Sequence, residues 1–366
     1  RQFFHVSPSG VMMRGIAVLT VILVLSPMVG GCLGTDLIPS MADDLPDEEP
    51  LRINHLQMKG THNSYHVEPI FSPTREYMYT HQELGVQASD LGVRQFELDV
   101  WWDVREGLRV YHNQYDSGTT CPTFQSCLEA LLLWSQGNSD HHPIMIWVEP
   151  KDWLEQGAEI TTTVELTGIL QEIEDEITQF WPANLTITPD DVRGDSPNLT
   201  GAVLDEGWPM IDESRGKAMF VLLATGDMRD LYMDERPGLV GAKMFPMFTS
   251  QGQYPGEEVV FSLTDPLSNG QEITRLVEEG FIVRTRADSG GVEPDNNDTT
   301  RFEAALASGA HTIATDYPGP VDGVEYWIDI PEGNPSRCNP VIAPNWCTSL
   351  DIESLSLIHI SEPTRP

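Results

Sequence analysis

Basic residues are scarce in this chain of 366 residues. Lysine and arginine together number 21 against 56 aspartates and glutamates, which gives a formal net charge of −35. Such an excess of negative charge repels the phosphate backbone of nucleic acids, so a nucleic-acid partner is not expected. An acidic surface poor in lysine is compatible with a salty habitat, where screening is strong, and equally with an ordinary soluble acidic protein.

Long apolar runs are also missing, because the longest one, residues 16–25, is too short to span a membrane comfortably. Met12, Met13 and Arg14 precede this run, and small residues ending in Gly31-Cys32 follow it. This order is typical of a cleaved signal peptide, predicted over residues 1–32. A cysteine directly after two glycines resembles a lipoprotein processing box, which predicts an acylated Cys32. The alternative is an ordinary signal peptide with an incidental cysteine.

Cysteine is rare as well. Apart from Cys32 the chain has only Cys121, Cys127, Cys338 and Cys347. An even number of cysteines in an exported protein predicts two disulfides, and four cysteines allow three pairings. The local pairs, Cys121 with Cys127 and Cys338 with Cys347, need the least rearrangement of the chain. The alternative is free buried thiols.

The rest of the chain has the composition of a globular protein, with 40% hydrophobic residues. Its length suits one large domain, predicted over residues 51–350. Residues 33–50 are rich in Asp, Glu and Pro and are predicted to be an acidic linker. Residues 356–366 continue no earlier pattern and are predicted to be a non-native tail.

Short apolar segments with strand character alternate with helical stretches, which favours a parallel sheet flanked by helices. Eight candidate strands predict an α/β fold of the TIM-type (β/α)8 barrel class, with a polar insertion over residues 182–216 between strands 4 and 5. The expected strands cover residues 56–59, 94–100, 109–111, 144–148, 218–223, 243–248, 281–284 and 312–314. The expected helices cover residues 123–134, 160–180, 272–279 and 299–307.

Polar residues gather at the ends of the first four candidate strands. In a barrel these ends share one rim, where catalytic residues of this fold collect. Glu97 and Asp99 are two residues apart and therefore face the same side of a strand. The residues in question are His62 and Asn63 after the first strand, Glu97 and Asp99 in the second, His112 after the third and Glu149 after the fourth.

This set of side chains predicts a cation site. Two inward carboxylates repel each other unless they are protonated or bind a metal. Glu97, Asp99 and Glu149 with the amide of Asn63 form an all-oxygen set, which suits calcium before magnesium. The histidines remain available for proton transfer. Each motif alone has a non-functional explanation, such as a solvated Glu-x-Asp pair on the surface. Compatible groups at four successive strand ends favour a functional site over such explanations.

The arrangement resembles the catalytic domain of calcium-dependent phosphatidylinositol-specific phospholipases C, especially the bacterial single-domain type. The resemblance spans about residues 55–318. Its most specific segments are Met58-Lys-Gly-Thr-His-Asn-Ser-Tyr65, Gly92-Val-Arg-Gln-Phe-Glu-Leu-Asp99, Tyr111-His-Asn113 and Trp147-Val-Glu-Pro-Lys151. Its less specific segments are Arg215-Gly-Lys217, Val283-Arg-Thr-Arg-Ala-Asp288 and Thr315-Asp-Tyr-Pro318.

The resemblance implies a role for each matching residue. His62 would stabilise charge on the phosphoryl oxygens, and His112 would be the general acid that protonates the leaving glycerol oxygen. Glu97 or another carboxylate would accept the proton of the attacking inositol hydroxyl. The implied Ca2+ ligands are Asn63, Glu97, Asp99 and Glu149. The residues assigned to substrate binding are Lys151, Lys217, Arg284 and Arg286.

The resemblance further implies a phospholipid substrate at a membrane surface. The protein is expected to be a monomer, and the predicted signal peptide with Cys32 predicts that it is exported and anchored by lipid on Cys32, or secreted. The strand that begins after Lys217 has no internal lysine, which weakens the case for inositides with phosphorylated rings. A glycerophosphodiester phosphodiesterase is the nearest rival, but its opening motif is normally His-Arg rather than His62-Asn63. A non-catalytic surface lipoprotein is the other rival, and the intact pair of histidines argues against it.

Overall fold

The computed structural model describes residues 49–353 except 73, 104, 152–162 and 334. The predicted signal peptide, Cys32, nearly all of the linker and the 356–366 tail lie outside the described residues. No helix in the described part of the chain combines the length and apolar composition needed to cross a membrane.

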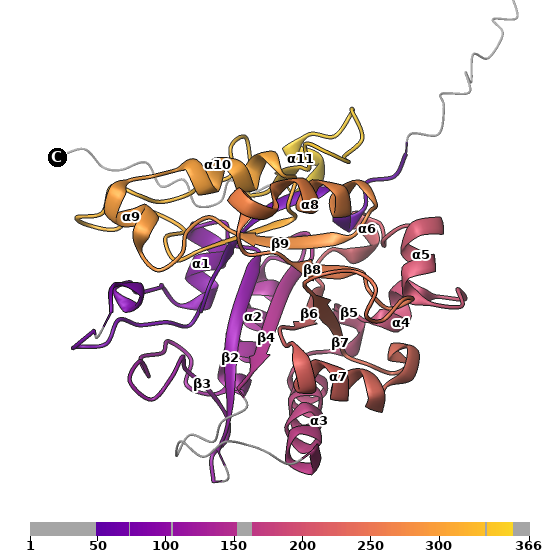
Figure 1. Cartoon of the computed structure of the whole chain (residues 1–366), viewed down its shortest axis with the longest axis horizontal. Helices are drawn as coiled ribbons and strands as arrows, with labels where there is room; N and C mark the ends of the chain where they lie inside the picture. The colour runs from indigo at the N-terminus through magenta and orange to yellow at the C-terminus, as the bar shows by residue number, and fades with distance from the viewer. Residues whose placement is uncertain (1–48, 73, 104, 152–162, 334, 354–366) are drawn as a thin grey trace, which may run out of the picture. The chain divides into compact units, whose positions relative to one another are not determined.

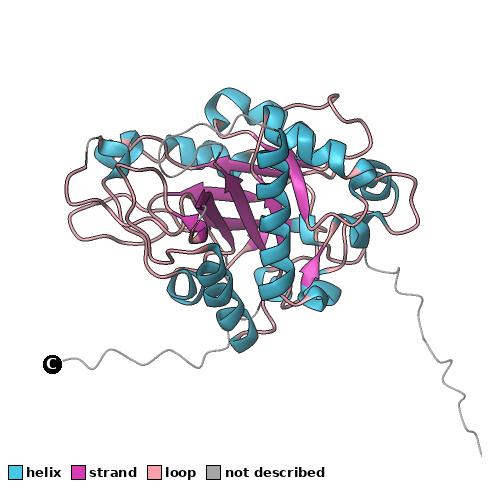
Figure 2. Ribbon diagram, turned by 90° about the horizontal axis from the view of Figure 1, so that it is seen from below, coloured by secondary structure: helices cyan, strands magenta, loops and turns pink. Residues whose placement is uncertain are grey.

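Eight parallel strands close into a barrel, which confirms the predicted TIM-type fold. β1 pairs with β10 on one side and with β2 on the other, and these two pairings close the ring. Figures 1 and 2 show the strands surrounded by helices. The barrel strands are β1 (Leu56–Thr61), β2 (Gln95–Asp103), β4 (Ile144–Pro150), β6 (Ala218–Leu222), β7 (Met244–Phe248), β8 (Val260–Ser262), β9 (Ile282–Arg286) and β10 (Thr312–Thr315).

Three further strands attach to this barrel. β3 (Gly107–Val110) is antiparallel to the end of β2, β5 (Thr186–Ile187) pairs with β6, and β11 (Arg337–Cys338) is antiparallel to β1. The prediction of a barrel strand at 109–111 is therefore wrong, because this segment is the return arm of a hairpin. The sequence analysis missed β8, whose three residues are too few to show a period.

The helices cover the outside of the barrel. α2 begins at Thr123, whose side chain accepts a hydrogen bond from the Ser126 N–H, and its buried side chains recur at helical spacing. The helices are α1 (Leu84–Asp90), α2 (Phe124–Gly137), α3 (Thr163–Phe180), α4 (Pro189–Arg193), α5 (Leu199–Asp205), α6 (Ile211–Ser214), α7 (Gly226–Glu235), α8 (Pro266–Glu278), α9 (Val292–Asn296), α10 (Thr300–Ala307) and α11 (Ser349–Ile352). Short 3-10 turns cover Ile53–His55, Arg75–Tyr77, Ala183–Leu185 and Pro237–Leu239.

The polar segment 182–216 is an insertion, as expected, and it carries β5, α4, α5 and α6. It follows α3 and precedes β6, so it lies between the third and fourth barrel strands rather than the fourth and fifth. The shift in count follows directly from the misassigned hairpin strand.

Side chains along β2 point alternately to the hydrophobic core around the barrel and to the inside of the barrel, where the site lies. Phe96 and Leu98 are buried in the main hydrophobic cluster. Glu97 and Asp99 therefore face the opposite side, toward the inside of the barrel. Trp147 of β4 is buried there too, and the guanidinium of Arg284 lies 5.2 Å from its ring centroid.

Several histidines are buried in the neutral form. His311 Nε2 lies 2.8 Å from the Asn54 carbonyl oxygen, and His311 Nδ1 accepts the Val283 N–H at 3.1 Å. Burial lowers the pKa of His311 to about 3. Burial also lowers the pKa of His142 to about 3 and that of His141 to about 4. Protonation of any of them opposes folding.

We expect the free energy of unfolding to fall as the pH is lowered from 6.5 toward 4. In this window the unfolded chain binds protons at histidines that the folded protein keeps neutral. His311→Gln should make the dependence shallower by about 1.4 kcal/mol per pH unit, the contribution of one proton. Urea unfolding of the wild type and the variant at pH 6.5, 6.0, 5.5 and 5.0 measures the slope of the unfolding free energy against pH. An unchanged slope in the variant would contradict a neutral buried His311.

Candidate active site

Three carboxylates converge at the carboxyl ends of β2 and β4. The parallel register places Asp99 directly beside Glu149. Glu97 is two residues earlier on the same face of β2. Ligand atoms of Glu97, Asp99 and Glu149 all lie within 4.8 Å of one another, and Glu97 and Asp99 are buried. The structure thus brings together the three acidic residues that the sequence predicted to share a cation.

Two basic side chains balance this charge. Lys151 Nζ lies 2.8 Å from Asp99 Oδ2 and donates to Glu149. Arg284 of β9 donates to the buried Glu97. Burial and then the charge of Asp99 raise the pKa of Glu149, although Lys151 opposes this shift. Burial lowers the pKa of Lys151, but the charges of Asp99 and Glu149 outweigh it and hold the pKa above its ordinary value.

The residues at this position fit a calcium ion. Among the described residues, neither oxygen of Asp99 receives a well-aligned hydrogen bond, although Lys151 Nζ lies 2.8 Å from Oδ2 and the Tyr65 hydroxyl lies close enough to interact with Asp99. A buried carboxylate without such donors is costly unless something else satisfies it. Hard oxygen ligands of this kind are those that calcium prefers.

Asn63 lies in the turn that follows β1, beside the acidic cluster. The residue is buried and has φ of 44°, a left-handed conformation that asparagine tolerates better than most residues. The next residue ties this turn to β2 twice, since Ser64 N–H donates to the Glu97 carbonyl and Ser64 Oγ accepts the Glu97 N–H. These bonds place the turn that carries Asn63 beside β2, while the Asn63 side chain itself interacts with the Tyr79 hydroxyl.

His62 is oriented by an acidic residue from the other end of the chain. His62 Nδ1 lies 2.8 Å from Asp316 Oδ1, and Arg286 donates to Asp316 Oδ2 at 3.2 Å. Burial alone would raise the pKa of Asp316, but His62 and Arg286 hold it well below its usual range. Burial and the charge of Asp316 raise the pKa of the adjacent Asp288 to about 7. Asp316 therefore stays ionised beside His62.

His112 has its own buried carboxylate. His112 Nδ1 lies 2.9 Å from Asp116 Oδ2, and His66 Nε2 lies 2.8 Å from Asp116 Oδ1. Burial alone would lower the pKa of His112, but the hydrogen bond to Asp116 and the charge of Asp99 outweigh it and raise the pKa. With Nδ1 bound to Asp116, Nε2 of His112 is left to face a substrate.

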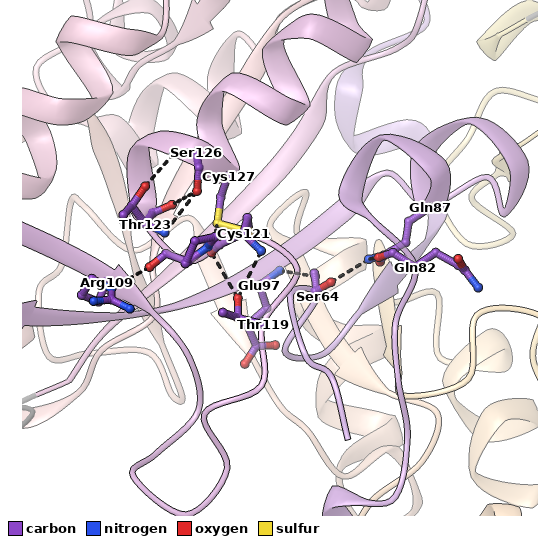
Figure 3. Close-up of a disulfide and its surroundings, with 11 residues drawn as sticks. Ser64, Gln82, Gln87, Glu97, Arg109, Thr119, Cys121, Thr123, Ser126 and Cys127 are labelled. Carbon is purple, nitrogen blue, oxygen red and sulfur yellow. Dashed lines mark hydrogen bonds between the residues drawn. A yellow bond between two sulfur atoms is a disulfide. The ribbon is translucent and has the colours of Figure 1, made fainter. Parts of the chain in front are cut away.

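A disulfide fixes the loop that carries Asp116. The chain forms Cys121–Cys127 and Cys338–Cys347, the two local pairs. Figure 3 shows the first of them where α2 begins, with Thr119 hydrogen-bonded to the backbone of Cys121. The same loop donates the Thr120 N–H to the Tyr65 carbonyl at 2.8 Å. These two anchors follow Asp116 in the chain, and on its other side the Asn113 N–H donates to the Asp116 carbonyl at 3.1 Å.

A cavity of about 470 Å³ is lined by part of this site, although Asn63, Asp99 and His112 are not among its lining residues. His62, Glu97 and Glu149 line one wall, together with Lys151, Arg284 and Arg286. The other wall carries hydroxyl and apolar groups from the ends of β6, β7 and β8. These are Leu223, Ala224, Thr225, Met228, Met247, Thr249, Ser262 and Thr264.

One predicted site residue lies elsewhere. Lys217 immediately precedes β6, and its carbonyl accepts the N–H of Ile144 at the start of β4. Parallel strands begin at the end of the barrel opposite the site, so the assignment of Lys217 to substrate binding is wrong. The sequence analysis also missed Asp116, Asp316 and His66. Asp316 lay in a matching segment, whereas Asp116 and His66 carried no local signal.

Fold and site together define a TIM barrel with a candidate divalent-cation site and two histidine–carboxylate pairs at the carboxyl ends of its strands. The sequence model of the family described as phosphoinositide phospholipase C, Ca2+-dependent, matches residues 51–113 and 104–340. The chain belongs to this family, whose members are phosphoric diester hydrolases that depend on calcium.

Solved structures agree on the fold. The chain resembles a calcium-dependent phosphoinositol-specific phospholipase C from Pseudomonas sp. with 18% identity and a TM-score of 0.52, covering 74% of this chain and 92% of that one. It also resembles a Ca2+-dependent phosphatidylinositol-specific phospholipase C from Streptomyces antibioticus with 20% identity and a TM-score of 0.54, covering 73% and 95%. The comparison with curated proteins finds no match.

We expect Asp99→Asn to weaken calcium binding by about tenfold or more, because it removes one charged oxygen from the cluster. Lys151→Met should have the opposite effect, since it removes a cation that competes for the same carboxylates. Isothermal titration with CaCl2 measures both, and circular dichroism checks that each variant is folded. Wild-type affinity in Asp99→Asn would exclude Asp99 as a ligand.

Proposed function

We propose that this protein cleaves phosphatidylinositol into diacylglycerol and a cyclic inositol phosphate. One observation carries the proposal. Two histidines, His62 and His112, each paired with a buried carboxylate, come from the loops next to the acidic cluster. Family membership supports the reaction class, and the cluster supports the need for calcium.

The proposed reaction is an intramolecular displacement. The inositol 2-hydroxyl oxygen attacks phosphorus, and the bond from phosphorus to the glycerol oxygen breaks. The hydroxyl proton passes to a carboxylate, and His112 gives a proton to the departing oxygen. His62, held by Asp316, donates to the phosphoryl oxygens. Calcium bound by Asn63, Glu97, Asp99 and Glu149 would neutralise phosphate charge and make the hydroxyl more acidic.

Glu149 is the better candidate for the proton acceptor. Glu97, assigned to this role from the sequence, is buried and already binds Arg284. Glu149 is partly open to the cavity, where a substrate hydroxyl can reach it, although Lys151 binds it as Arg284 binds Glu97. Glu97 would then contribute to metal binding alone.

The basic residues of the cavity favour an inositol ring without phosphates. Lys151 is bound to Asp99, Arg284 to Glu97 and Arg286 to Asp316. Each basic side chain lining the described cavity therefore has a carboxylate partner. The segment 152–162 that continues from Lys151 contains no lysine or arginine. The hydroxyls of Thr225, Thr249 and Thr264 suit the hydroxyls of a sugar ring.

We also propose that the protein is exported and anchored by lipid on Cys32. The sequence from Met12 to Cys32 supports this location, and so do the two disulfides, which belong to an oxidising compartment. Labelling with radioactive palmitate should mark the wild-type protein and not Cys32→Ala. Equal labelling of the wild type and of Cys32→Ala would contradict a lipid anchor on Cys32.

The decisive experiment is a headgroup panel with and without calcium. Vesicles containing phosphatidylinositol should release diacylglycerol and cyclic inositol phosphate only when calcium is present. Phosphatidylinositol 4,5-bisphosphate and phosphatidylcholine should be poor substrates. Cleavage of glycerophosphoinositol in place of the lipid would favour a glycerophosphodiester phosphodiesterase, and no turnover of any phosphodiester would favour a binding protein.

Asp116→Asn should move the alkaline limb of the pH–rate profile to lower pH. The carboxylate raises the pKa of His112, so its loss deprotonates the general acid at a lower pH and reduces the rate most on the alkaline side. His112→Ala should cost about a hundredfold or more at every pH. Asp140→Asn, an exposed carboxylate at the opposite end of the barrel, is the control. A uniform loss with an unmoved limb would mean that Asp116 is only structural.

A further inference from the structure

Two histidines share the carboxylate of Asp116. His66 Nε2 lies 2.8 Å from Oδ1 and 3.0 Å from Oδ2 of this carboxylate, and His112 Nδ1 lies 2.9 Å from Oδ2. The side chains of Asp116 and His66 are fully buried, whereas that of His112 is 25% exposed. His66 cannot reach a substrate, so any part it plays in the reaction has to pass through Asp116.

The surroundings of His66 fix which of its ring nitrogens carries the proton. His66 Nδ1 is buried and has no hydrogen-bond partner among the described residues. A proton on Nδ1 would leave an unsatisfied N–H in the interior, which costs free energy. The proton of a neutral His66 therefore sits on Nε2, and this N–H donates to Asp116.

His66 is held in this position by contacts on several sides. Its ring lies against that of Tyr79, with the two centroids 4.2 Å apart. Its backbone N–H donates to the Asn63 carbonyl at 2.8 Å, and its backbone carbonyl accepts the His81 N–H at 2.9 Å. The donor that faces Asp116 is thus fixed by the packing and not by Asp116 alone.

From this shared carboxylate we infer that His66 is a positioning residue that limits how strongly Asp116 holds the proton of His112. The inference rests on the proposed function, in which His112 is the general acid. The hydrogen bond from His66 stabilises the negative charge of Asp116, so His112 meets a weaker partner than an unshared carboxylate would be. A general acid has to give up its proton, and a proton held too tightly is transferred slowly.

The other ionisable groups near His112 come from three further elements. The charge of Asp99 on β2 favours the protonated form of His112, and that of Lys151, after β4, opposes it. The Tyr77 ring lies 5.1 Å from the His112 ring between centroids. In the part of the chain that the structure describes, none of these three side chains hydrogen-bonds to Asp116. Competition for that carboxylate is therefore left to the buried histidine.

The test compares two substitutions in the full chain. His66→Phe removes the donor, and His66→Gln keeps an amide donor near the place of Nε2. With calcium and phosphatidylinositol vesicles, His66→Phe should move the alkaline limb of the pH–rate profile up by about half a pH unit, because Asp116 then serves His112 alone. This direction is opposite to that expected for Asp116→Asn. His66→Gln should leave the limb close to its wild-type position.

A double variant shows whether His66 acts through Asp116. His66→Phe combined with Asp116→Asn should place the limb where Asp116→Asn alone places it, because the connection between the two histidines is already lost. His141→Phe is the matched control, since His141 is also a buried histidine but lies at the opposite end of the barrel. It should leave the limb unmoved, and circular dichroism checks that every variant is folded.

Two measurements by NMR need no turnover. In the wild-type protein at pH 7, 1H–15N spectra of the imidazoles should show a proton on Nε2 of His66 and none on Nδ1. In EDTA, the titration of His112 in protein with 13C-labelled histidine should move to higher pH in His66→Phe, by about the shift of the alkaline limb.

The inference would be overturned by a folded His66→Phe in which the limb and the His112 titration stay in place or move down. It would also be overturned if His66→Gln shifted them as far as His66→Phe. A proton on Nδ1 of wild-type His66 would contradict it even if no variant at this position folds. If the proposed function fails, no pH–rate profile exists, while the NMR titration of His112 still decides whether His66 weakens the hold of Asp116.

Discussion

The balance of charge inside the barrel mouth is the constraint on which the site depends. Glu97, Asp99 and Glu149 are brought within reach of one another by the register of β2 and β4. Buried like charges of this kind are tolerated only with compensating charge. Arg284 and Lys151 supply part of it, and the poorly satisfied oxygens of Asp99 leave room for a divalent cation to supply the rest.

Two pairs of histidine and carboxylate extend this arrangement on either side. Asp316 and Asp116 are both buried, and each fixes the tautomer and direction of a histidine that faces outward. The pairs are built differently. Asp316 follows β10 at the end of the barrel, whereas Asp116 belongs to a loop held by a disulfide and by hydrogen bonds to the loop after β1.

The fold was predictable to the level of the barrel because most strands are long enough to show their character. The errors have particular causes. The 109–111 segment, Arg-Val-Tyr, contains residues that favour strands, and only its antiparallel pairing with β2 reveals the hairpin. β8 has three residues and offers no period to detect. Because one false strand replaced one missed strand, the count of eight was right while its membership was not.

The amino-acid sequence by itself determined which chemical groups stand at the strand ends, because a motif such as Glu97-Leu98-Asp99 places two carboxylates on one face of any strand. It also carried the family resemblance. Only the tertiary structure decided which basic side chain pairs with which carboxylate. Arg284, for example, binds Glu97, which is 187 residues away in the sequence. It likewise placed Lys217 at the wrong end of the barrel and set Asp116 against His112. Contacts between segments so distant are settled by strand order and closure, and no local pattern in the sequence records them.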